Sequence, residues 1–377
     1  MRLPPPNPAD EHRPWVRRAS PLARVAWLIA AVLIAYGGLA PWSGWRDLGL
    51  SPFAYLTAPF PRYVTRFDLV VNVIAFAPLG ALGVLALHPR LRGWAAVLVS
   101  SAISVLLSGT IEGLQTYLPR RVPSNVDLLT NSLGAVLGAA AVAPWSAALI
   151  DRGRLAQLRA QWFARDATVP LLALALWPLA QVFPAAMLFG NGEMRGTFAA
   201  IAGALGAPWP PLPRAAFGPA EFVLAEAIVV SAGLFSAGLA AVSLMNAAAP
   251  RWLLLALLAG AALLARGLAW GVQFGPEHAT GWLTPGAIGG LLLGGLALAV
   301  AATGPPRLLG AIAVVSLIML VAAVNAVPEN PFFADWIGAW RPGRLMHASA
   351  LAQWVAVGWP YLMLAVLLFR ALAVWRR

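Results

Sequence analysis

The chain has 377 residues, of which 60% are hydrophobic and only 11% are Asp, Glu, Lys or Arg. A soluble domain carries about 25% charged residues, so this composition excludes an ordinary water-exposed surface. All 26 basic residues are Arg, the formal net charge is +12, and the absence of Cys excludes disulfides and Cys-ligated metals.

Long apolar stretches predict an all-α fold, a polytopic transmembrane helix bundle of about ten spans. Several stretches reach the roughly 20 residues that cross the hydrocarbon core of a bilayer. We place them at 22–40, 68–87, 93–114, 125–149, 167–189, 219–245, 250–271, 284–303, 307–327 and 351–372. The first stretch is long and ends without a clear cleavage site, so we expect a retained helix and not a signal peptide.

The distribution of Arg among the short loops predicts the orientation. With ten spans, 16 of the 26 Arg lie on the side that holds both termini. Cytoplasmic loops carry an excess of basic residues, so we expect both termini in the cytoplasm and the protein in the bacterial inner (cytoplasmic) membrane. Four acidic residues on that side leave a net +12 there, which we expect to face anionic lipid of the bilayer and not nucleic acid.

The charged segment 150–166 separates four predicted spans from six. We therefore expect a basic cytoplasmic tail over 1–21, a four-helix transmembrane domain over 22–149, a charged cytoplasmic linker over 150–166 and a six-helix transmembrane domain over 167–377. An amphipathic helix at the interface is one interpretation of the linker.

Polar residues of the second, third and fourth spans recur three or four positions apart, which places them on one helical face. They are Asp68 and Asn72, then Ser104, Ser108, Glu112 and Gln115, then Asp127 and Asn131. The second and fourth spans start and the third ends on the outer side. One level near the outer leaflet is therefore shared by Asp68, Asn72, Glu112, Gln115, Asp127 and Asn131, and Arg66, Arg120 and Arg121 can converge there. Gly134 and Gly138 continue the last pattern and predict a surface for close helix packing.

Two interpretations of this cluster remain open. In the structural one, Asp68 and Asp127 are helix N-caps and Glu112 pairs with an Arg to hold two helices together. In the functional one, the polar groups outnumber what caps and one ion pair require, and polar groups at membrane depth are costly. We predict a ligand-binding or functional polar cluster: Asp68, Asn72, Glu112, Gln115, Arg121, Asp127 and Asn131.

Three motifs carry a family resemblance. They are DLVVNVIAFAPLG with Asp68, Asn72, Phe76, Pro78, Leu79 and Gly80, SGTIEGLQTYLPRR with Glu112, Gln115 and Arg121, and RVPSNVDLLTNSLGAVLG with Asp127, Asn131, Gly134 and Gly138. On these residues the segment 22–145 resembles the VanZ-like family, named for a teicoplanin-resistance membrane protein. The stretch RFDLVVN lacks the His that some members carry. The resemblance implies an envelope-associated membrane protein that influences glycopeptide sensitivity, and it implies no known reaction.

The six C-terminal spans give fewer signals. We predict a Glu–Arg ion pair between neighbouring helices, from Glu221 and Glu226 at the start of the sixth span and Arg266 near the end of the seventh. The four His are scattered, so we predict no metal site. Neither a P-loop nor a dinucleotide-binding motif occurs, so we predict no cofactor.

Three functions therefore stay open. We favour a non-catalytic envelope protein whose outward polar site binds a cell-wall precursor, a glycolipid or a polysaccharide intermediate, with a lipid-linked saccharide as one such ligand. A membrane-embedded enzyme would use Glu112 or Asp127 as a general base. A secondary transporter is less favoured, because the charges lie near one face of the membrane and not at its midplane. Neither the role of 167–377 nor the oligomeric state follows from the sequence.

Overall fold

The computed structural model describes residues 20–40, 42–61, 66–150, 154–195, 203, 217–328 and 346–375. Most of the predicted basic tail, residues 1–19, lies outside them. Over the described residues the regular structure is helical, apart from one isolated antiparallel bridge between Phe163 and Met245. The chain divides into two compact units, residues 1–158 and 159–377, each treated separately below.

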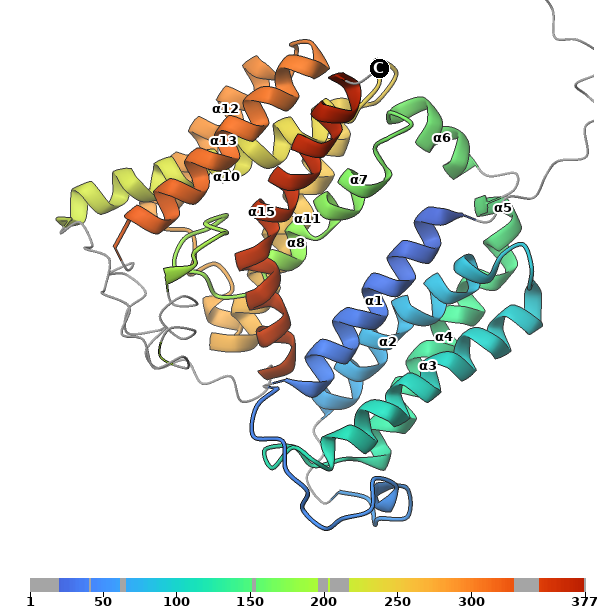
Figure 1. The fold of residues 1–377 in the computed structure, drawn as a ribbon. Coiled ribbons are helices and arrows are strands. Elements are labelled where there is room, and N and C mark those ends of the chain that lie inside the picture. Colours follow the sequence, from blue (N-terminus) through green and yellow to red (C-terminus); the bar gives the residue numbers. More distant parts are fainter. Residues whose placement is uncertain are drawn as a thin grey trace, which may run out of the picture. The chain divides into compact units, whose positions relative to one another are not determined.

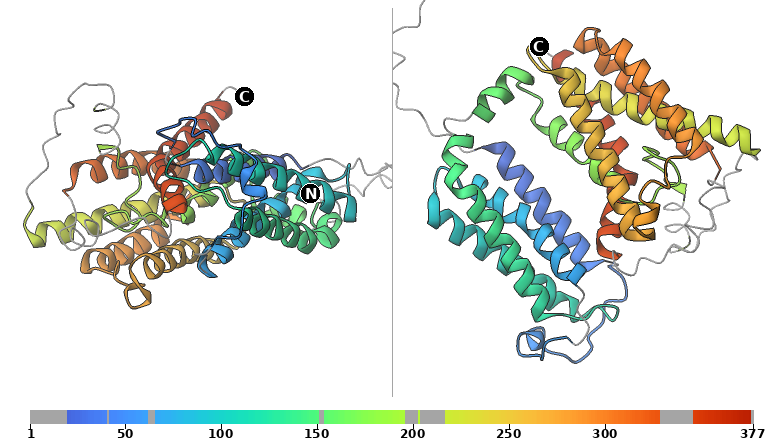
Figure 2. Two further views of the ribbon diagram at one scale, coloured as in Figure 1. Left: turned by 90° about the horizontal axis from the view of Figure 1, so that it is seen from below. Right: turned by 180° about the vertical axis from the view of Figure 1, so that it is seen from behind.

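Four long helices build the first unit, and consecutive helices run antiparallel (Figure 1). They are α1 (Pro21–Leu39), α2 (Arg66–Leu87), α3 (Gly93–Gln115) and α4 (Asn125–Val142), followed by η3 (Ala143–Trp145) and α5 (Ser146–Ile150). Ser20 and Ser124 cap α1 and α4 by accepting from the backbone N–H of the residue three positions on. The four helices stay side by side in both further views (Figure 2).

Helices α2 and α4 run parallel and touch backbone to backbone. A Cβ atom added to Gly134 would overlap the carbonyl oxygen of Val73, and one added to Gly138 would overlap that of Ala77. From the other side, a Cβ atom at Gly80 would overlap the carbonyl oxygen of Ala135. Glycine at these positions therefore allows the approach of the two helices.

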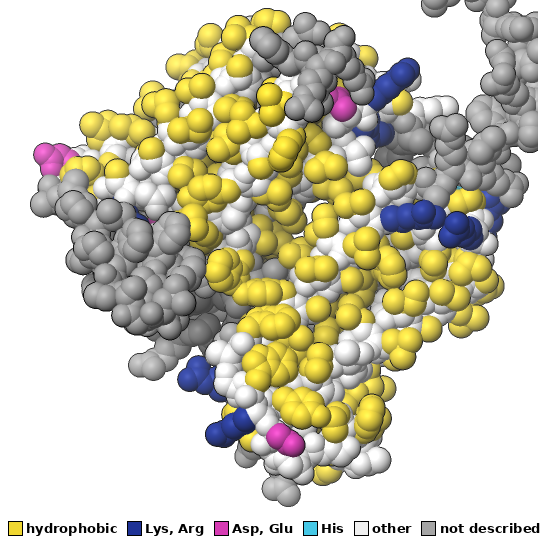
Figure 3. All heavy atoms as spheres, in the orientation of Figure 1, with side chains coloured by type: hydrophobic (Ala, Val, Ile, Leu, Met, Phe, Trp, Pro, Cys, Tyr) yellow, Lys and Arg dark blue, Asp and Glu magenta, His cyan; other side chains and the backbone are white. Residues whose placement is uncertain are grey.

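Helix α3 is polar inside and apolar outside. Ser100, Ser104 and Ser108 are buried against the bundle, whereas Leu98 and Leu106 are 68% and 70% exposed. Over the helices of this unit the visible face is mainly hydrophobic, and charged side chains lie near the helix ends (Figure 3). An apolar outer surface around a partly polar interior is what a lipid environment requires, so the unit is built to lie in a bilayer.

The second unit is organised around α10 (Pro219–Ser243), most of whose residues are buried. Gly290 and Gly294 of α12 lie against the backbone of α10 at Ala227 and Ser231. The described helices of this unit also include α7 (Thr168–Ala175), α8 (Trp177–Ala180), α11 (Arg251–Phe274), η4 (Pro276–His278), α12 (Pro285–Ala301), α13 (Pro306–Ala326) and α15 (Met346–Trp375), while α6 (Arg154–Trp162) contains the boundary between the units.

Among the described residues, eight helices are long and apolar enough to cross a membrane, and two shorter apolar helices accompany them. The long ones include all four helices of the first unit, and the short ones cover Thr168–Ala180 and Pro285–Ala301. The predicted all-α bundle of membrane-spanning helices is thus confirmed, and the ten predicted spans correspond to these eight long and two short helices.

The structure differs from the sequence prediction at the fifth stretch, 167–189, which is not one continuous helix. Helix α7 ends at Ala175, α8 ends at Ala180, and residues 181–194 are irregular. Pro178 lacks the N–H that would bond to the carbonyl of Leu174, and its ring crowds that carbonyl. The apolar side chains of this stretch predicted a membrane span, but hydropathy carries no information on a break in the backbone.

The contact between α2 and α4 predicts a selective effect of small substitutions. Gly138→Ala places a methyl group on the carbonyl oxygen of Ala77, so the helices must separate, at a cost of about 1–3 kcal/mol. We expect a lower midpoint of thermal unfolding, measured by circular dichroism of the detergent-solubilised protein. Gly260→Ala in α11 and Gly295→Ala in α12 are the controls, because their added Cβ atoms meet nothing within 4 Å. An equal midpoint in all three variants would contradict this packing.

Candidate functional site

At one end of the first unit, polar side chains of α2, α3 and α4 connect to one another. The Asn72 amide, near the start of α2, donates to Oδ1 of Asp127 at 3.0 Å and to Oγ1 of Thr130 at 3.3 Å. The Thr130 hydroxyl in turn donates to the carbonyl of Val126 at 2.9 Å. The parallel approach of α2 and α4 therefore brings two predicted site residues, Asn72 and Asp127, into direct contact.

Ser124 joins the Glu112 carboxylate of α3 to the first turn of α4. Its hydroxyl accepts from the backbone N–H of Asp127 at 3.3 Å, and its own backbone N–H donates to Oε2 of Glu112 at 2.8 Å. Ser124 is therefore the N-cap of α4, and Asp127 lies in the first helical turn. The interpretation of Asp127 as the cap is wrong. The spacing of Ser124 and Asp127, a polar residue followed three positions later by an acid, was the sequence signal for this cap.

One turn deeper, α3 and α4 are joined again. The amide of Asn131 donates to the hydroxyl of Ser108 at 3.0 Å, and the Asn131 side chain is only 7% exposed. Its Oδ1 atom has no hydrogen-bond partner among the described residues. A buried amide oxygen without a partner is costly, so this position has an acceptor available for a further donor.

Gln115 and Arg121 hold the end of α1. The Gln115 amide donates to the carbonyl of Gly38 at 2.9 Å. Arg121 donates to the carbonyls of Gly37, Gly38 and Ala40 at 3.0, 2.7 and 3.0 Å. These carbonyls lack partners within the helix, so the guanidinium acts as a C-terminal cap.

Burial lowers the pKa of Arg121 to about 10, while the charges of Glu112 and Asp127 oppose this shift. At neutral pH the side chain therefore stays protonated, and it supplies positive charge to the carboxylates of the cluster. The electrostatic coupling links the end of α1 to the pair formed by α3 and α4.

The loop between α1 and α2 packs against the C-terminal part of α3, which the sequence did not indicate. The hydroxyl of Tyr55, in η2 (Ala54–Leu56), donates to the carbonyl of Gly109 at 3.2 Å. Burial, together with the nearby charge of Glu112, raises the pKa of Tyr55. The backbone N–H of Arg46 also donates to the carbonyl of Tyr117 at 3.0 Å. No periodic pattern in 42–61 marks these contacts.

The cluster has a buried interior and a partly exposed rim. Glu112 is 3% exposed, and Gln115 and Asn131 are also buried. Asn72, Arg121, Asp127 and Thr130 are half-buried. The rim offers a carboxylate, an amide and a hydroxyl, which are groups that bind hydroxyls and amides. The side chain of Asp68, at the start of α2, lies outside the described residues.

In the second unit, the predicted ion pair between Glu226 and Arg266 is replaced by another arrangement. Arg266 donates to the carbonyls of Phe183 and Ala185 at 2.7 and 2.6 Å, in the irregular segment after α8. Glu226 accepts from the hydroxyl of Thr284 at 2.6 Å, and its Oε1 has no hydrogen-bond partner among the described residues. Glu226 is 0% exposed and Arg266 is 1% exposed. The sequence identified both buried charges but not their partners.

Within the part of the chain that the structure describes, no three His, Cys, Asp or Glu side chains gather as a metal site would require.

Comparison with known proteins supports the sequence resemblance. Residues 25–146 match the sequence model of the VanZ/LLP1 family, and this range covers most of α1 and all of α2, α3, α4 and η3. The resemblance predicted for 22–145 is confirmed, and this part of the chain is a VanZ-like domain of a multi-pass membrane protein. No curated protein and no solved structure matches the chain.

The capping of α1 by Arg121 gives a prediction with a built-in control. Arg121→Gln removes the charged donors to three carbonyls, and a hydrogen bond to a charged group contributes about 1.5–3 kcal/mol. We expect a clearly lower midpoint of thermal unfolding in detergent. Arg120→Gln removes the same charge from an exposed neighbouring side chain and should leave the midpoint unchanged. Equal midpoints for the two variants would show that Arg121 does not hold α1.

Proposed function

We propose that the VanZ-like domain is a non-catalytic binding module of the bacterial cytoplasmic membrane. In this proposal its outward-facing rim of Asn72, Asp127 and Thr130 binds the polar headgroup of a lipid-linked cell-wall or polysaccharide precursor. Binding of such a precursor would connect the domain to glycopeptide (teicoplanin) sensitivity.

The contact between Asn72 and Asp127 carries this proposal. A carboxylate and an amide from two helices lie 3.0 Å apart, half-buried, at the end of the bundle. Neighbouring acceptor and donor groups of this kind match the hydroxyls and amides of a saccharide or peptide headgroup. The glycine contact between α2 and α4 fixes their spacing, so the pair is held in place before any ligand arrives.

The burial of Glu112 in the interior of the cluster favours binding over catalysis. Glu112 is held by the backbone N–H of Ser124, and Gln115 is held by the end of α1, where the half-buried Arg121 also binds. These side chains support the helices that carry the rim. A reacting group would need to reach the substrate, and the exposed fraction of Glu112 is only 3%.

Substitution of the rim tests the proposal. Asp127→Asn keeps the size of the side chain but removes its charge and reverses part of its hydrogen-bonding pattern. We expect at least about tenfold weaker binding, equivalent to about 1.4 kcal/mol. The measurement uses the full chain in nanodiscs with a fluorescent polyprenyl-diphosphate disaccharide-pentapeptide.

Asp47→Asn is the matched control, because Asp47 is an exposed loop carboxylate that accepts from its own loop at Gly49. The same pair of variants is compared for the teicoplanin sensitivity of cells that express the protein at equal levels. Wild-type binding by Asp127→Asn would overturn the proposal.

A membrane-embedded enzyme is the second candidate, and the electrostatic interaction between two carboxylates favours it. The Glu112 carboxylate accepts from the backbone N–H of Ser124, and the charge of Asp127 lies close enough to act on it. A carboxylate in a nearly dry site is a suitable general base. If this candidate is correct, labelled lipid-linked precursors are turned over by the wild type, and Glu112→Gln abolishes turnover while precursor binding persists. If the wild type turns over no precursor, the enzyme is excluded and the non-catalytic binding module remains.

The interruption of the fifth span favours the transporter hypothesis, and the sequence analysis did not predict this interruption. Secondary transporters form substrate sites where membrane helices are interrupted, and α7 and α8 are followed by an irregular segment whose carbonyls bind Arg266. If the second unit transports a solute, Glu226→Gln should reduce proteoliposome uptake at least tenfold. Glu277→Gln, an exposed carboxylate, is the control. Equal uptake by both variants would exclude a role of Glu226.

A further inference from the structure

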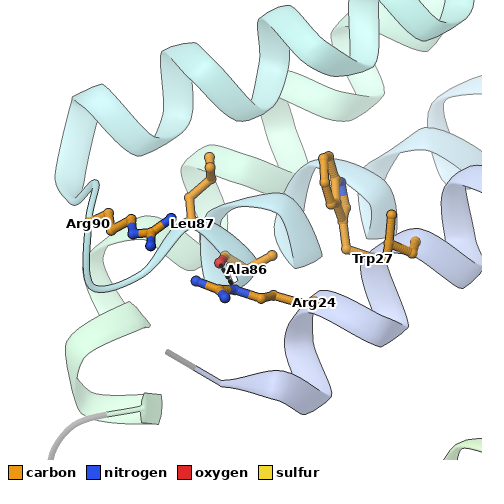
Figure 4. A pocket seen from close by; sticks show the side chains of 6 residues that line it. Arg24, Trp27, Ala86, Leu87 and Arg90 are labelled. Carbon is orange, nitrogen blue, oxygen red and sulfur yellow. Dashed lines mark hydrogen bonds between the residues drawn. The ribbon is translucent and has the colours of Figure 1, made fainter. Parts of the chain in front are cut away.

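At the end of the VanZ-like domain where α1 begins and α2 ends, the structure contains a small open cavity. Its volume is about 260 Å³. It is lined by Arg24, Trp27, Leu28, Ala86, Leu87 and Arg90 (Figure 4). The polar cluster lies at the opposite helix ends, where α1 ends and α2 begins, so the cavity is a separate feature of the domain.

We propose that this cavity binds the phosphate headgroup of an anionic phospholipid. Two guanidinium groups would hold the phosphate, and an acyl chain would follow the exposed apolar side of α1. The inference does not depend on the function proposed for the polar cluster.

The two Arg side chains supply the charge. Arg24 donates through Nε to the carbonyl of Ala86 at 3.3 Å, which occupies one of its five N–H donors. The side chain of Arg90 is exposed, and its guanidinium lies on the same side of the end of α2 as that of Arg24 (Figure 4). None of the lining residues is acidic. Guanidinium groups bind phosphate oxygens through paired N–H donors, so the cavity favours a phosphate over a neutral headgroup.

The contact of Arg24 with Ala86 also fixes the guanidinium in place. The carbonyls in the last turn of a helix have no partners within the helix, and Arg24 satisfies one of them. The side chain is thereby ordered across the mouth of the cavity before a ligand binds. A preordered cation loses less conformational entropy on binding than a freely rotating surface Arg.

The apolar surroundings distinguish a lipid from a free anion. Leu28, which lines the cavity, is 57% exposed, and Val25 and Val32 are exposed on the same helix. Positions 25, 28 and 32 lie three and four residues apart, so they form one ridge along α1. A ridge of apolar side chains that starts at a phosphate site suits an acyl chain. Trp27 completes the lining with an amphipathic ring of the kind enriched at membrane interfaces.

The predicted orientation agrees with this ligand. The beginning of α1 and the end of α2 lie on the Arg-rich side, which the sequence places in the cytoplasm. Anionic lipids are enriched in that leaflet, and each basic residue near its surface contributes about 1 kcal/mol of attraction.

Native mass spectrometry of the purified full-length chain in uncharged detergent tests the proposal. The probes are phosphatidylglycerol, the zwitterionic phosphatidylcholine with the same acyl chains, and inorganic phosphate. We expect adducts of phosphatidylglycerol at lower concentration than those of phosphatidylcholine, and no adduct of inorganic phosphate at equal concentration. Arg24→Gln and Arg90→Gln should each weaken phosphatidylglycerol binding about fivefold, and the double variant more than tenfold.

The control variant Arg120→Gln/Arg165→Gln removes two exposed Arg side chains that do not line the cavity. Arg90→Gln is the decisive single variant if Arg24→Gln lowers the midpoint of thermal unfolding, because the Arg90 side chain is exposed. Arg24→Lys should keep part of the binding by keeping the charge.

Three results would overturn the proposal. In the first, phosphatidylglycerol binds the double variant and the wild type equally. In the second, the control variant loses as much binding as the double variant, which would indicate attraction by net charge alone. In the third, inorganic phosphate binds with the same dependence on Arg24 and Arg90 and phosphatidylglycerol does not, which would identify a site for a free anion.

Discussion

The backbone contact between α2 and α4 is the constraint on which the arrangement of the VanZ-like domain depends. Lipid provides no hydrophobic force between helices, so their association relies on close van der Waals contact along small residues. Gly134 and Gly138 meet the carbonyls of Val73 and Ala77, and this contact sets the relative height of the two helices. Asn72 precedes Val73 and Asp127 lies two turns before Gly134, so the same contact brings the amide and the carboxylate together.

The second constraint is that polar groups at the helix ends need partners inside the protein. Ser124 satisfies the start of α4 and binds Glu112, while Arg121 and Gln115 satisfy the end of α1. Most of the predicted cluster therefore has a structural role. Asn72 and Asp127 differ, because a hydrogen bond joins their side chains across two helices. In the proposed function, these two side chains are the ones that contact a ligand.

The sequence predicted the helices well because hydropathy measures the property that a bilayer selects. It also predicted the common level of Glu112 and Asp127, since alternation of the loops fixes which helix ends meet. The contacts of Tyr55 and the carbonyl partners of Arg121 were not predictable, because loop geometry depends on tertiary contacts that leave no periodic signal. The break after Ala175 was missed for another reason: Pro178 was visible, but mean hydropathy does not record backbone hydrogen bonds.

The same reasoning makes Glu226 and Arg266 informative about the unit that the family match does not cover. An Arg buried to 1% exposure would usually be expected beside its counter-ion, yet here its donors satisfy the carbonyls of a broken span. Glu226 is left with one hydroxyl partner and one unpartnered oxygen at 0% exposure. The two charges still attract each other, although each side chain has its hydrogen bonds to other groups. The irregular backbone after α8 therefore takes up the donors of Arg266, while the Glu226 carboxylate accepts from Thr284 at the start of α12.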